Sequence, residues 1–251
     1  MKLFGLRLPM MSSLVLWAVL WEAVGRADVV FLVPPLSGVV RALARLAGSS
    51  QFLAATATTL KSFVLGMALA VAVGVPLGIL MGRVRAADRL LSMWVNLFVS
   101  APLTALVPVL MLLFGLGDRT IVATVFLFAV WIIVLDTQAG VRHVPPSLIE
   151  MARCYGAGPV ALHARIILWA ALPEILAGVR LGVIRGVKGV VIGQLLVSIV
   201  GYGALFELYS RNFLMEEFWA LTLLMFAFAL ALSAVVGAVE RRVEYYAGVR
   251  Q

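Results

Sequence analysis

Six long apolar stretches dominate this sequence of 251 residues and restrict it to folds that lie in a membrane. They cover roughly residues 8–24, 62–81, 90–114, 121–138, 175–200 and 218–239. About 20 apolar residues in a helix cross a hydrocarbon core of about 30 Å. Only 13% of the residues are charged, against about 25% in a soluble domain. The pattern predicts an all-α, polytopic membrane protein with six transmembrane helices in a single transmembrane domain, residues 1–251.

The first stretch follows Lys2 and Arg7, as the apolar core of a secretory signal peptide would. A cleavage site of small residues does not follow, because the next residues are Trp21 and Glu22 and then Ala-Val-Gly-Arg. We therefore expect a retained first span that begins in the cytoplasm.

The basic residues between the spans support this orientation. With the N-terminus inside, eleven basic residues lie on the cytoplasmic side and six outside, in accord with the positive-inside rule. Both termini are then expected in the cytoplasm. The inner set is Lys2, Arg7, Arg83, Arg85, Arg89, Arg142, Arg153, Arg165, Arg241, Arg242 and Arg250, and the outer set is Arg26, Arg41, Arg45, Lys61, Arg119 and Arg211.

The outer connection over residues 33–60 is too long to be a simple turn. After Pro34 and Pro35, Ser37 is expected to cap a short helix that ends at Ala47. Apolar residues between Val39 and Leu46 share one broad face of that helix. We expect it to lie on the membrane surface.

The inner connection over residues 144–173 predicts a cytoplasmic helix-turn-helix. Its first helix begins either with a capping box of Ser147 and Glu150 or with Pro146 at the first helical position. Gly156 is expected to end this helix in the left-handed conformation. A second helix would begin at Gly158-Pro159 and run towards Pro173. An exposed corner between two spans is well placed to contact a partner.

The same segment carries a specific motif. Glu150-Met151-Ala152, three residues, Gly156, nine residues and then Ile166-Ile167-Leu168 resemble the EAA-x3-G-x9-I-x-L-P signature of ATP-binding cassette importer permeases. Met151 replaces the usual second alanine, and Trp169 replaces the usual proline. The later Leu172-Pro173 resembles the nitrate, sulfonate and taurine branch. The residues that the resemblance assigns to ATPase coupling are Glu150, Met151, Ala152, Gly156, Ala157, Gly158, Ile166, Leu168 and Pro173.

The resemblance implies the partners and the location of the chain. They are a cytoplasmic ATPase dimer, a second permease subunit (another copy or a similar chain), and a periplasmic or lipid-anchored substrate-binding protein, with the permease in the bacterial inner membrane. The sequence has no G-x-x-x-x-G-K-[ST] loop, so we expect ATP and Mg²⁺ to be bound by the ATPase. His143, His163 and Cys154 are isolated, so we expect no metal site, no cofactor and no enzymatic centre. The basic residues are dispersed between spans, and we expect no nucleic-acid partner.

The fifth span carries glycines at four-residue spacing, at positions 178, 182 and 186 and again at 189 and 193. Such stripes let membrane helices approach closely. The sequence leaves open whether this span packs within one bundle or across a dimer axis.

Five residues are candidates for the translocation pathway. Arg185 and Lys188 lie one turn apart in the fifth span, where they either line a path for an anion or extend to lipid headgroups. Gln194 stands where glutamate is expected from the resemblance, which favours an anionic substrate such as a sulfonate, taurine or nitrate. Pro102 and Pro108 interrupt the third span. The alternatives are a neutral or cationic vitamin precursor, or an ion-coupled secondary transporter, which the lack of acidic span centres disfavours.

Overall fold

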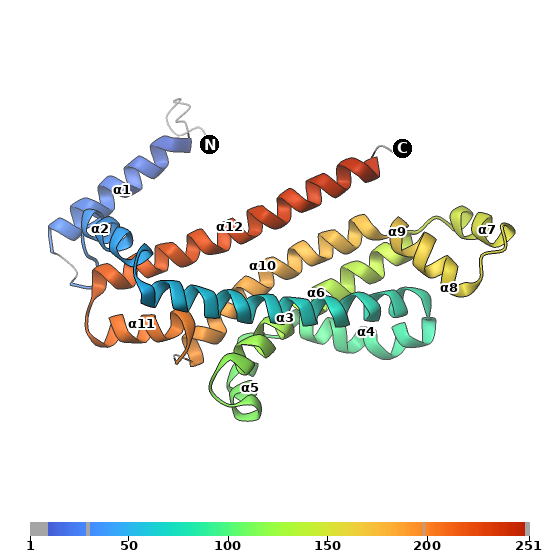
Figure 1. The fold of residues 1–251 in the computed structure, drawn as a ribbon, viewed down its shortest axis with the longest axis horizontal. Coiled ribbons are helices and arrows are strands. Elements are labelled where there is room, and N and C mark those ends of the chain that lie inside the picture. Colours follow the sequence, from blue (N-terminus) through green and yellow to red (C-terminus); the bar gives the residue numbers. More distant parts are fainter. Residues whose placement is uncertain (1–9, 29–30, 198, 249–251) are drawn as a thin grey trace.

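The computed structural model describes residues 10–28, 31–197 and 199–248, and this part of the chain is built from helices without any strand. The helices form an elongated bundle in which most long helices run along one axis (Figure 1). Helices α7 (Pro146–Cys154), α8 (Pro159–Leu162) and α9 (Leu168–Ala170) lie at one end of the bundle, and α2 (Leu36–Ala47) and α11 (Gly201–Arg211) lie at the other (Figure 1).

Three long helices form the centre of the bundle. Helix α6 (Asp118–His143) lies between α3 (Ser50–Arg83) and α10 (Leu172–Val197). The core between them consists of apolar side chains such as Ile121, Val125 and Ile133, all completely buried. These helices present small residues to one another, so their backbones approach closely.

Glycines of both flanking helices contact α6. A Cβ atom added at Gly78 of α3 would lie 2.6 Å from Cβ of Thr137, and one at Gly182 of α10 would lie 2.8 Å from Ile133. Gly178 meets Asp136 of α6 in the same way. The glycine stripe of the fifth span therefore packs within one bundle, which is one of the two alternatives that the sequence left open.

The end of the bundle away from α7 to α9 is closed by two helices, α2 and α11, which are not among the six apolar stretches. Helix α2 (Leu36–Ala47) buries Val39, Ala42 and Leu46 in a cluster with α11 (Gly201–Arg211) and α12 (Met215–Gly248). The apolar face of α2 is thus covered by the subunit itself. The expectation that this face lies on the membrane surface is therefore wrong. Helix α11 was absent from the expected elements.

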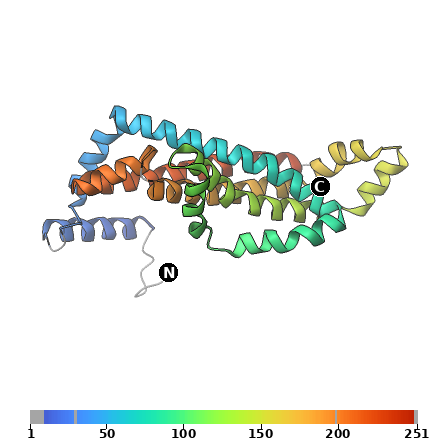
Figure 2. The same ribbon diagram turned by 90° about the horizontal axis from the view of Figure 1, so that it is seen from below.

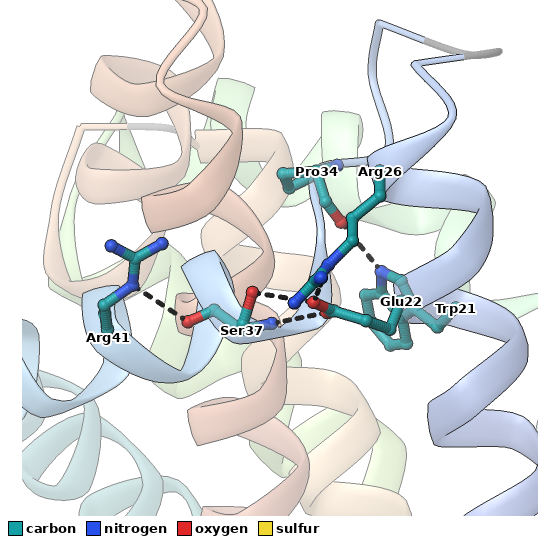
Figure 3. Close-up of polar contacts among 6 residues, drawn as sticks. All are labelled: Trp21, Glu22, Arg26, Pro34, Ser37 and Arg41. Carbon is teal, nitrogen blue, oxygen red and sulfur yellow. Dashed lines mark hydrogen bonds and ion pairs between the residues drawn. The ribbon is translucent and has the colours of Figure 1, made fainter.

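The start of α2 is tied to α1 (Met10–Arg26) by polar contacts (Figure 3). Ser37 donates from its backbone nitrogen and from its hydroxyl to the carboxylate of Glu22, each over 2.9 Å. Trp21 donates from Nε1 to the carbonyl of Pro34 over 3.0 Å. The helix begins at Leu36 with no side-chain cap. The expected Ser37 cap is therefore wrong, because this hydroxyl bonds a neighbouring helix.

The third span is broken. Helix α4 (Arg85–Ser100) and the pair η1 (Leu103–Leu106) and α5 (Val107–Phe114) meet at an angle of 97°. Ala101 is extended, as the residue before a proline prefers to be. Pro102 then starts the short 3₁₀ helix, whereas Pro108 lies in the first turn of α5, where a proline is tolerated. The expected interruption at Pro102 is confirmed, and Pro108 is accommodated.

Among the described residues, three helices are long and apolar enough to cross a membrane: α3, α6 and α12 over Met215–Val235. The pairs α4 with η1 and α5, and α8 to α9 with α10, bring the number to five if each bent pair is one span. Residues 8–9 of the expected first span lie outside the described residues. The count of six stays a prediction.

Candidate functional site

The corner with the signature motif begins with α7 (Pro146–Cys154). Pro146 occupies the first helical position, and no side chain caps the helix. Of the two predicted starts, the one with proline is therefore found, and Ser147 and Glu150 form no capping box. Proline suits this position because the first turn leaves its backbone nitrogens without helical partners.

Gly156 ends α7 in the left-handed conformation, with φ of +77°. Its backbone nitrogen donates to the carbonyl of Arg153 over 2.9 Å, and that of Ala157 donates to Ala152 over 3.0 Å. These two bonds form a Schellman motif, which satisfies the last carbonyls of the helix. The turn predicted at Gly156 is confirmed.

The second half of the corner begins at Gly158-Pro159 as expected. Helix α8 (Pro159–Leu162) passes into the π-helical turn η2 (His163–Ile167) and then α9 (Leu168–Ala170). The chain bends by 64° at the junction with α10, where Pro173 is the second residue. Trp169 continues the helix in place of proline, and the bend occurs two residues later, at Ala171.

The motif residues divide into an inner and an outer set. The inner set packs in one cluster with Ile167, which is completely buried. Its motif members are Ala152, Ala157, Ile166 and Leu168. Glu150, Met151, Gly156 and Gly158 are exposed, and Pro173 is half-buried at the bend. The motif thus includes residues that hold the corner together and residues that it presents outward.

Two large residues on the corner were missed by the sequence reasoning. Tyr155 is 87% exposed and Val160 is 81% exposed, one on each side of the Gly156 turn. Apolar side chains this exposed at the tip of a projection are typical of a contact surface. Beside them, an apolar groove of about 440 Å³ runs between Ile79 of α3 and Val160 and His163 of the corner. The sequence signal that could have identified Tyr155 and Val160 is their position close to Gly156.

The charged pathway candidates lie on α10. Lys188 is exposed and Arg185 is half-buried. Asp136 of α6 is close enough to Arg185 for an electrostatic interaction. The sequence reasoning did not single out Asp136, although it lies within the predicted fourth span. Arg185 therefore has an acidic neighbour inside the bundle, where an isolated charge would be costly.

The remaining candidates do not lie together with Arg185 and Lys188. Gln194 is completely buried and bonds Thr59 of α3, so in this structure its side chain lines no surface. Pro102 and Pro108 are exposed at the break of the third span. Of the three candidates on α10, Gln194 is buried and bonded to α3, whereas Lys188 is exposed and Arg185 is half-buried.

Comparisons with known proteins agree with this architecture. The chain matches the family described as "Binding-protein-dependent transport system inner membrane component" over residues 74–245. A "Probable ABC transporter permease protein" of Brucella melitensis biotype 1 is 32% identical over 73% of this chain and 74% of its own length. The taurine transport system permease protein TauC of Escherichia coli K12 is 27% identical over 76% of this chain and 72% of its own length.

A solved structure shares the fold. A chain of the inward-facing MetNI methionine ABC transporter matches with a TM-score of 0.65 and 20% identity, over 77% of this chain and 96% of that chain. The family match covers more than half of the residues, including the corner, helices α6 and α10, the last ten residues of α3 and most of α12. Members of this family work with an ATPase and a substrate-binding protein. The chain belongs to the binding-protein-dependent transport family and is the membrane-embedded permease subunit of an ABC importer.

Proposed function

We propose that the corner around Gly156 is the surface on which the ATPase docks, and that the permease carries a small anion. The observation that carries the docking surface is the left-handed turn at Gly156 with Tyr155 and Val160 exposed beside it. The inner set of motif residues packs this corner against α6 and α10, so a displacement of the corner would be transmitted to the central helices.

The proposed assembly contains two permease subunits, either two copies or this chain with a similar one, around a shared pathway. The ATPase dimer would bind ATP and Mg²⁺ and close, and closure would move the corners of both permeases. Nucleotide drives this change only because it binds one global state more tightly than the other. A periplasmic or lipid-anchored binding protein would deliver the substrate at the α2–α11 end, with both termini of the permease in the cytoplasm.

The docking surface is tested by co-purification with the ATPase. Tyr155→Asp with Val160→Asp places two charges on the exposed apolar surface and should abolish ATPase association while the permease still inserts. Val40→Asp is the control, because Val40 is 54% exposed at the opposite end of the bundle. Retained association in the double variant, or equal loss in the control, would contradict the docking surface.

The anionic substrate is supported by the two cations of α10 and by the similarity to TauC. Arg185→Gln with Lys188→Gln should lower uptake per assembled complex in proteoliposomes, while ATPase binding is kept. Reduced insertion with unchanged uptake per complex would show that these side chains only reach lipid headgroups.

Asp136 favours a second candidate, a zwitterion. Its carboxylate lies near Arg185, so a substrate with an acidic and an amino group would find a partner for each charge. Asp136→Asn should then weaken uptake of an amino sulfonate more than uptake of the same sulfonate without the amino group. Equal effects on both substrates would favour the simple anion.

A further inference from the structure

A second charged site lies where α3 ends and α4 begins. A pocket of about 440 Å³ opens between these helices and the last turn of α6. Four arginines and one acidic residue line it, a formal charge of +3: Arg83, Arg85, Arg89 and Arg142, with Asp88. The turn joins two membrane helices, so it lies near the depth of lipid headgroups.

The single carboxylate already accepts from three donors of the chain. Asp88 pairs with Arg142 over 2.5 Å and accepts from Ser92 over 2.7 Å and from Gln138. Within the described residues, no carboxylate lies within ion-pair distance of Arg83, Arg85 or Arg89. Three arginines therefore line the pocket without an ion-pair partner among the described residues.

An exposed apolar face continues directly from this pocket along α4. Leu90, Met93, Trp94 and Leu97 are each at least 50% exposed. Their spacing of three to four residues places them on one side of the helix. Figure 2 shows α4, drawn in turquoise, along one margin of the bundle. The face begins one residue after Arg89.

We propose that this pocket binds the headgroup phosphate of an anionic phospholipid, whose acyl chains lie along the apolar face of α4. Guanidinium groups match phosphate oxygens in geometry and charge, and basic pockets between membrane helices are suited to anionic headgroups. The apolar face distinguishes a lipid from a soluble phosphate, because a soluble anion gains nothing from it. The proposal requires only that α3 and α4 are embedded in the membrane.

Occupancy of the pocket would affect the docking corner. Arg142 lines the pocket and lies three residues before Pro145, where the chain leaves α6 for α7. A headgroup bound between Arg142 and the three arginines of the α3–α4 turn would hold this turn to the end of α6. The bound lipid would thereby steady the base of the corner.

The test measures lipid retention by the full-length permease in neutral detergent, using native mass spectrometry. We expect dioleoyl phosphatidylglycerol to be retained about tenfold better than dioleoyl phosphatidylcholine. Arg83→Gln with Arg85→Gln and Arg89→Gln should reduce this preference to within about twofold. The control removes the same charge away from the pocket, by Arg41→Gln, Arg119→Gln and Arg211→Gln, and should keep the preference. An unchanged preference in the first triple variant would overturn the proposal.

Two further arms keep the test decisive. Inorganic phosphate at the same concentration should not displace the long-chain lipid, and full displacement would assign the pocket to a soluble anion. Dihexanoyl phosphatidylglycerol should bind clearly more weakly than the dioleoyl form, because its chains cover less of α4. If the triple variant does not fold, Arg85→Gln alone should lower the preference at least threefold, and an unchanged value would again contradict the site.

Discussion

Gln194 of α10 donates from Nε2 to Oγ1 of Thr59 on α3 over 2.8 Å, and both side chains are completely buried. Thr59 itself donates to the carbonyl of Ala55 over 2.8 Å, and its hydroxyl also lies 3.2 Å from Oε1 of Gln194. Gly203 of α11 packs on the backbone of Gln194, where an added Cβ would lie 2.0 Å from the carbonyl oxygen. This pair therefore joins three helices at the α2–α11 end.

The first prediction concerns the asymmetry of this pair. Thr59→Val leaves the amide of Gln194 buried without its partner and should cost about 1–3 kcal/mol of unfolding free energy. Gln194→Leu should cost less, because the hydroxyl of Thr59 still bonds Ala55. SDS titration of the purified permease measures both, and in the Gln194→Leu background the Thr59→Val change should become smaller. If the two substitutions lowered the unfolding free energy equally and additively, the bond between Gln194 and Thr59 would not couple them.

The second prediction concerns the close packing of α3 on α6. A Cβ at Gly78 would lie 2.6 Å from Cβ of Thr137 and 2.7 Å from the carbonyl oxygen of Val134. Because backbone cannot move aside cheaply, Gly78→Ala should separate the helices and cost about 1–3 kcal/mol. Gly48→Ala is the control, since its Cβ would have no neighbour closer than 4.0 Å. Thermal unfolding in detergent should separate the two variants, and equal melting temperatures would contradict the packing.

Much of the corner could be predicted from the sequence because its determinants are local. Gly156 and the proline pairs act on the backbone within a few residues, and the turn, the helix start at Pro146 and the start at Gly158-Pro159 are all found. The break at Pro102 is local in the same sense. The side on which each motif residue lies depends on packing, and the exposure of Tyr155 and Val160 was therefore missed.

The start of α3 was missed for a local reason. The helix begins at Ser50, about twelve residues before the apolar stretch, because Ser49 caps it by accepting from Phe52. The following features depend on other helices and could not be predicted. Ser37 was expected to cap α2, but its hydroxyl donates instead to the carboxylate of Glu22 on α1. Gln194 was assigned to the pathway because the resemblance suggests glutamate there, whereas its partner Thr59 is 135 residues away.

The third prediction concerns Asp136 and Arg185. Removing either charge leaves the other without compensation inside the bundle. A fully buried pair would lose about 3–5 kcal/mol, and for these half-buried residues we expect a smaller cost, about 1–3 kcal/mol. Asp136→Asn with Arg185→Gln should be more stable than either single variant, as measured by SDS titration. A double variant that is less stable than both singles would show that the two groups do not compensate each other.

The last prediction compares the two glycines of the corner. An added Cβ would meet no atom within 4 Å at either Gly156 or Gly158, so steric contact does not distinguish them. Gly156 has φ of +77°, whereas Gly158 has φ of −67°. Alanine at Gly156 is therefore strained by about 1–2 kcal/mol, because the left-handed region brings its Cβ close to the backbone. Alanine at Gly158 adopts an ordinary extended conformation.

The strain at Gly156 should appear in coupling rather than in folding, because the corner lies outside the central core. We expect Gly156→Ala to weaken ATPase association or to uncouple ATP hydrolysis from uptake, and Gly156→Val to do so more strongly. Gly158→Ala should retain both properties. Association is measured by co-purification, and coupling by the ratio of substrate transported to ATP hydrolysed in proteoliposomes. If the two alanine variants behave alike, the left-handed turn is not what positions the docking surface, and the contact must depend on the exposed side chains beside it.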